Sequence, residues 1–92
     1  MTNTFSSRTI KVFNDTDETL FYELSTQKEG SSIPPHDSVT VSFSQITLLE
    51  LIFIFFRNQG LAVRYSRRYG LTKDTYDDIH VKFENSDIII TK

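Results

Sequence analysis

The sequence predicts an all-β protein, a small antiparallel β-sandwich of six to seven strands. Apolar and polar residues alternate along most of the chain, which is typical of strands with one buried face. Turn-forming residues recur about every ten positions, and no helical period is present. The 92 residues include 8 Phe and 4 Tyr, and aromatic residues favour strands. We expect a flexible N-terminus over residues 1–7 and a single domain over residues 8–92.

Composition excludes several classes of chemistry. The chain has no cysteine, so it forms no disulfide, thiolate zinc site or thiol nucleophile. The formal net charge of −2 gives no general attraction to nucleic acid, which makes nucleic acid an unlikely partner. The first residues lack an apolar leader, and the main apolar run is shorter than the ~20 residues of a membrane helix. The cytoplasm is the default location, with leaderless secretion left open.

The first half of the chain predicts three strands. Ile10 and Val12 alternate with Thr9, Lys11 and Phe13 over residues 8–13. The following Asn14-Asp15-Thr16-Asp17 has the composition of a turn. Residues 18–25 alternate again. Two consecutive prolines make residues 26–37 a loop, because proline cannot donate to a ladder. Residues 38–44 complete the set, with Val39, Val41 and Phe43 predicted to face inward.

The run from Ile46 to Phe56, ITLLELIFIFF, is apolar on consecutive positions and has only two polar residues. A strand of this kind is buried on both faces. One face would carry Leu51, Phe53 and Phe55, and the other Ile52, Ile54 and Phe56. A single helical turn is the alternative at the start of the run, near Ser44 to Leu49, since apolar residues there would also share a helical face.

The second half predicts two hairpins. Asn58-Gln59-Gly60 has the composition of a three-residue loop, and it would join the central run to a strand over residues 61–68. A polar loop follows over residues 69–77. The strand expected over residues 79–83 would turn tightly at Asn85-Ser86 into an apolar strand over residues 88–91. A polar turn after the first strand and a proline-bearing loop before the third recur in immunoglobulin-like modules, so the sandwich is expected to be immunoglobulin-like or similar. These features identify no family.

The second apolar face of the central run needs a cover. The loop over residues 26–37, the strand from Ile88 to Ile90, lipid, or a second copy of the chain would each supply one. We predict a homo-oligomer that associates through apolar strand faces, because closed dimers are the commonest assemblies. The predicted interface residues are Ile52, Ile54, Phe56 and Ile89.

Arginine and tyrosine interleave from Arg64 to Tyr69. Guanidinium groups bind oxyanions and aromatic faces stack on sugars, so the strip suits an anion, glycan or lipid ligand. The predicted ligand-binding residues are Arg57, Arg64, Arg67, Arg68 and Tyr69. The alternative is a half-exposed strand whose arginines pair with Glu50 or Glu84.

Two loops are rich in carboxylates. If consecutive strands run up and down, the turn after the first strand and the loop after the fifth lie at one end of the sandwich. Ca²⁺ takes six to eight oxygen ligands, and its candidate ligands are Asp15, Asp17, Asp74, Asp77 and Asp78. The alternative is a set of solvated turn residues balanced by Arg67, Arg68 and Lys73. No other cofactor is indicated.

Neither histidine has an evident catalytic partner. His36 lies in a proline-bearing loop and His80 on the outward face of a strand, so no nucleophile–base set is apparent. The sequence therefore favours a non-enzymatic interaction module that self-associates through the strand faces from Ile46 to Phe56 and from Ile88 to Ile90. The alternative is a ligand-binding β-sandwich, lectin-like or lipid-binding, with or without Ca²⁺, that uses the end loops and the strip from Arg64 to Tyr69.

Overall fold

The computed structural model describes residues 7–25, 30–44, 49–59, 61–72 and 74–92. These residues form eight β-strands: β1 (Ser7–Asn14), β2 (Leu20–Leu24), β3 (Ser31–Ile33), β4 (Ser38–Ser44), β5 (Leu49–Gln59), β6 (Leu61–Leu71), β7 (Asp78–Glu84) and β8 (Asp87–Thr91).

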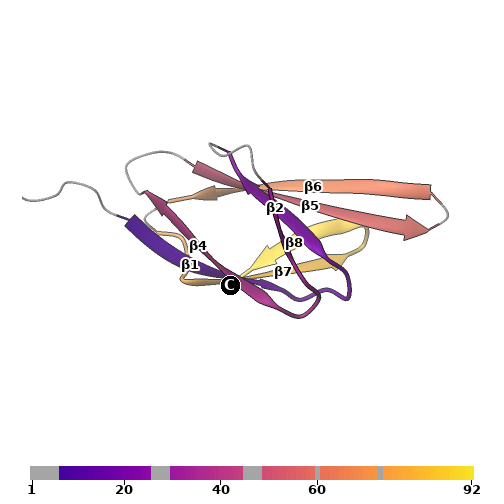
Figure 1. Ribbon diagram of the computed structural model, residues 1–92, viewed down its shortest axis with the longest axis horizontal. Helices are drawn as coiled ribbons and strands as arrows, with labels where there is room; N and C mark the ends of the chain where they lie inside the picture. The colour runs from indigo at the N-terminus through magenta and orange to yellow at the C-terminus, as the bar shows by residue number, and fades with distance from the viewer. Residues whose placement is uncertain (1–6, 26–29, 45–48, 60, 73) are drawn as a thin grey trace, which may run out of the picture.

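The strands form two four-stranded sheets (Figure 1). The first sheet has the order β4-β1-β7-β8 and the second β3-β2-β5-β6. Alternate residues of both sheets fill one shared core; its largest fully buried side chains are Phe53, Ile10, Leu20, Ile33, Leu51, Ile79, Ile88, Val12 and Val81. The predicted all-β sandwich is confirmed, with eight strands instead of six or seven.

One strand pair departs from the antiparallel prediction. β1 runs parallel to β7, with Val12 opposite Ile79 and Asn14 opposite Val81. The order also differs from that of an immunoglobulin constant domain, in which the first two strands share a sheet; here β1 and β2 lie in different sheets. Local alternation carries no information about either feature, because both depend on which distant strands pair.

Most strand positions agree with the sequence, and β4 has the predicted bounds. Several predictions of element bounds were wrong. Residues 69–71, predicted to begin a polar loop, belong to β6. Ser7 belongs to β1, where it pairs with Ser44, and not to a flexible tail. Residues 31–33 form the edge strand β3 inside the predicted loop. Asn58 and Gln59 pair with Ala62 and Leu61, so they extend β5 and are not loop residues.

The helical alternative concerned residues 44–49. Ser44 ends β4, and residues from Leu49 onwards belong to β5, so the described part of this segment is extended. Residues 45–48 lie outside the described residues, as do residues 1–6 and Gly60.

The predicted tight turn between β7 and β8 is confirmed. Glu84 pairs with Asp87, and the two residues between them have positive φ, 51° for Asn85 and 60° for Ser86. Positive φ at both central positions defines a type I′ turn, whose twist matches that of the flanking strands.

The molecule is elongated, with principal extents of 58 × 24 × 19 Å. Its radius of gyration is 14.1 Å, whereas a compact domain of this length has about 12 Å. The β5–β6 hairpin explains the difference, because it extends past the rest of the sandwich (Figure 1). β2 pairs with β5 only between Leu51 and Phe55, so the distal part of the hairpin is a two-stranded ribbon.

Candidate functional site

The central strand β5 has two apolar faces, as the sequence predicts. Leu51 and Phe53 point into the core and have no exposed surface. Ile52 and Ile54 alternate with them, lie on the opposite face of the sheet and are half-buried. The side chain of Phe56 lies outside the described residues, although its backbone pairs with that of Arg64.

The outer face of the second sheet is the surface on which Ile52 and Ile54 lie. Strand register places Phe21, Ile54 and Ser66 in one row across this face. Phe21 is 40% exposed, an unusually open position for a large aromatic side chain. The face thus has an apolar centre formed by one residue of β2 and two of β5.

Charged residues border this centre on opposite sides. The next row of the outer face contains Glu23 on β2, Ile52 on β5 and Arg68 on β6. Arg64 and Arg68 are both exposed and lie on the same edge strand. In this row the outer face therefore carries an acid on β2, an apolar residue on β5 and a base on β6.

No described strand covers this face. The segment proposed as a roof contributes β3, which pairs beside β2 as an edge strand. Its Ile33 is fully buried in the core. The other proposed cover, β8, belongs to the first sheet.

The predicted interface residues do not form one surface. Ile52 and Ile54 lie on the outer face of the second sheet. Ile89 pairs with Lys82 in the first sheet and alternates with the core residue Ile88, so it lies on the outer face of that sheet. β5 and β8 belong to opposite layers of the sandwich, so the two predicted strand faces would serve separate contacts, and their role in self-association stays a prediction.

The predicted arginine–tyrosine strip is also divided. Arg67 alternates with Arg64 and Arg68 along β6 and turns toward β8, where its Nη1 donates to the Ile88 carbonyl oxygen at 3.3 Å. The same nitrogen lies 3.6 Å from Asp87 Oδ2. Arg67 therefore bridges the two sheets along one side of the sandwich. Arg57 has its backbone opposite Val63, and its side chain lies outside the described residues.

The tyrosines of β6 pack toward the core. Tyr65 makes an edge-to-face contact with Phe83 of the first sheet, with 4.8 Å between ring centroids. Tyr69 packs against the core cluster. Burial raises the pKa of Tyr69, the nearby Tyr76 raises it further, and Arg8 opposes both effects. Of the predicted ligand-binding residues whose side chains the structure describes, only Arg64 and Arg68 share one exposed face.

The two acidic loops lie apart. Because β1 and β7 are parallel, the turn after β1 lies near the end of β7, whereas the loop before β7 lies at its start. Asp15 bonds His80, while Asp77 forms an ion pair with Arg8 near the start of β1, at 2.9 Å. The extra strand β3 reverses the direction of every later strand, so the expectation of one shared end was wrong. Within the described ranges, no three acidic or histidine side chains are grouped to hold a metal ion.

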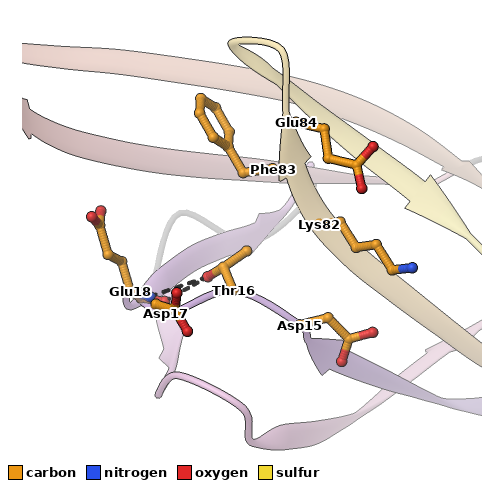
Figure 2. Close-up of a pocket in the computed structure, with 7 residues that line it drawn as sticks. All are labelled: Asp15, Thr16, Asp17, Glu18, Lys82, Phe83 and Glu84. Carbon is orange, nitrogen blue, oxygen red and sulfur yellow. Dashed lines mark hydrogen bonds between the residues drawn. The ribbon is translucent and has the colours of Figure 1, made fainter.

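The turn after β1 borders a shallow pocket (Figure 2) of about 170 Å³, lined by Asp15, Thr16, Asp17, Glu18, Lys82, Phe83 and Glu84. Two histidines fasten this turn. His36 Nε2 lies 2.7 Å from Asp17 Oδ1, and His80 Nδ1 lies 2.7 Å from Asp15 Oδ2. His80 also stacks on Phe13 at 4.6 Å. The His80–Asp15 contact links the turn to β7, and the His36–Asp17 contact links it to the proline-bearing loop. Among the described residues neither imidazole bonds a hydroxyl group.

Asn14 organises the same turn, a role that the sequence analysis missed. Its side chain is fully buried, and its amide nitrogen donates to the carbonyl oxygens of Glu18, Ile33 and Pro34 at 2.8–3.1 Å. Its Oδ1 accepts hydrogen bonds from the backbone nitrogen and the hydroxyl of Thr16. The detectable signal was an Asn-x-Thr sequence at the end of a strand, the pattern of an Asx turn.

Comparison of the chain with protein-family models, curated proteins and solved structures finds no match. The described residues contain no helix with the length and apolar character needed to span a membrane.

Proposed function

We propose that the protein is a non-enzymatic assembly module that self-associates through the outer face of the second sheet. The observation that carries this proposal is the double apolar character of β5. Leu51 and Phe53 are fully buried in the core, while Ile52 and Ile54 lie on the other side beside the exposed Phe21.

Burial of this face would stabilise an assembly. Complete removal of an exposed Ile or Phe side chain from water contributes about 1.5–3 kcal/mol. Ile52 and Ile54 are already half-buried and Phe21 is 40% exposed, so association would add a part of this amount at each of the three positions. Large apolar patches on soluble proteins usually mark interaction sites. The charged residues on both sides of the apolar centre resemble the polar rim of an interface.

The test places a charge at the centre of the face. Wild-type protein and the Ile54→Asp variant are compared by light scattering over a concentration series, with thermal unfolding as the check of folding. We expect a dimer or higher oligomer for the wild type. We expect a folded monomer for Ile54→Asp, because a desolvated, unpaired carboxylate would oppose association.

Thr9→Asp is the matched control. Thr9 is exposed and lies on a strand of the first sheet, opposite Ser42, so this variant should associate like the wild type. A wild type that stays monomeric throughout the series contradicts the proposal and favours the ligand-binding alternative. Unfolding of Ile54→Asp also contradicts it, because it would assign this face to the core of the monomer.

A further inference from the structure

We propose that the partner on the outer face is a second copy of the chain related by a two-fold axis parallel to β5. In this arrangement Glu23 of each copy meets Arg68 of the other. The inference rests on the proposed self-association and adds its geometry and its specificity-determining residues.

The first argument is charge. Glu23, Ile52 and Arg68 occupy one row on three neighbouring strands. Adjacent strands lie 4.7–4.9 Å apart, so about 10 Å separates the backbones of the acid and the base. Among the residues that the structure describes, neither Glu23 nor Arg68 has an ion-pair partner. A second copy with the opposite strand order would supply one for each.

The second argument is symmetry. A two-fold axis parallel to the strands keeps the rows and reverses the strand order, so β2 of one copy faces β6 of the other. Ile52 and Ile54 then meet their own copies at the centre. A two-fold axis that lies in the plane of the interface but perpendicular to the strands keeps the strand order and reverses the rows. It places Glu23 against Phe21 of the second copy. That contact would desolvate a carboxylate without pairing it.

Side-chain size supports the same axis. With the rows kept, the large Phe21 faces the small Ser66 of the second copy, so a protrusion meets a recess. The two Glu50 side chains approach each other at one end of the face. Sheets packed face to face cross at about 30°. Because Glu50 lies near the start of β5, away from the crossing point, this angle moves the two Glu50 side chains apart.

A charge exchange tests the pairing. Dimer dissociation constants are measured by sedimentation for the wild type, for Glu23→Arg, for Arg68→Glu and for the double variant that carries both changes. Each single change places like charges in contact twice per dimer, and we expect it to weaken the dimer about tenfold or more. The double variant restores both pairs in reversed polarity, so we expect its dissociation constant to return to within about threefold of the wild type.

The outcomes separate the two proposals. A wild-type dimer that Ile54→Asp dissociates, combined with a double variant as weak as the single ones, overturns the strand-parallel axis and leaves the self-association standing. A wild type that never associates removes both. Thermal unfolding of each variant identifies any loss of folding. Arg68 is exposed on an edge strand, so Arg68→Glu is the single change least expected to disturb the fold and is the best one to compare with the double variant.

Discussion

At the scale of single residues, Asn14 joins the two sheets by the hydrogen bonds of its side chain. Its side chain makes five hydrogen bonds while fully buried. Three of its partners are carbonyl oxygens from the β1–β2 turn and from the end of β3, so one amide joins both sheets.

Removal of this amide should destabilise the fold strongly. Asn14→Ala leaves buried carbonyl groups without donors, and each such group costs about 1–3 kcal/mol. We expect a loss of about 2–4 kcal/mol in the free energy of unfolding, measured by urea denaturation at one protein concentration. Asn14→Asp keeps the shape but directs a carboxylate oxygen at the same carbonyl groups, and should be at least as damaging.

Thr9→Ala provides the comparison. It removes an exposed hydrogen bond between the hydroxyl groups of Thr9 and Ser42, and surface changes of this kind stay within about 0.5 kcal/mol. If Asn14→Ala were as mild as Thr9→Ala, the bridging role of Asn14 would have to be abandoned.

At the scale of elements, the β7–β8 turn holds two residues in a conformation that disfavours side chains. Asn tolerates the left-handed region, but Ser86 at a φ of 60° carries a Cβ at a position that type I′ turns usually give to glycine. Ser86→Gly should therefore raise the free energy of unfolding by about 0.5–1 kcal/mol. Thermal or urea unfolding would measure the gain.

Ser86→Ala separates this backbone effect from the loss of the hydroxyl group. Alanine keeps the Cβ and the unfavourable φ, so we expect no gain in stability from it. Equal stability of the glycine and alanine variants would mean that the turn is unstrained and would refute the argument.

The elements also show how far the sequence could predict the fold. The two faces of β5 were predictable, because alternation along an extended strand is local and Leu51 to Ile54 obey it. β3 was not, because three residues between Gly30 and Pro34 are too few for alternation to appear. Its core residue Ile33 is fully buried, but a single buried residue beside two prolines has the same local pattern as a loop.

At the scale of the whole molecule, the missed strand changed the predicted site. One additional strand reverses the direction of all later strands. The loop that contains Asp74 and Asp77 therefore lies at the opposite end of the sandwich from the turn after β1, and not at the same end as predicted. The predicted interface residues are also separated, because β5 and β8 lie in different sheets and Ile54 and Ile89 therefore lie on different faces of the molecule. Residue types and faces were predictable from local pattern, whereas the convergence of distant residues depended on strand order, which the pattern does not contain.

The projecting β5–β6 hairpin provides a direct measure of the proposed two-fold axis. An axis parallel to β5 places both hairpins at the same end of the dimer, whereas a perpendicular axis places them at opposite ends. Because the chain has no cysteine, Asn58→Cys allows one spin label on each copy. Asn58 is five residues beyond Phe53, at about 3.3 Å per residue. We expect a distance of roughly 10–20 Å between labelled backbones for the parallel axis, against more than about 30 Å for the perpendicular one.

Pulsed electron spin resonance on the labelled dimer distinguishes these ranges, after allowance for the length of the label. Combining Asn58→Cys with Ile54→Asp gives the control, because a monomeric protein should lose the dipolar signal. A long distance that disappears in this control would show a dimer on the same face with the perpendicular axis. Glu23 would then face Phe21 of the second copy, and its exchange with Arg68 would restore nothing, so the two measurements must agree for the strand-parallel arrangement to stand.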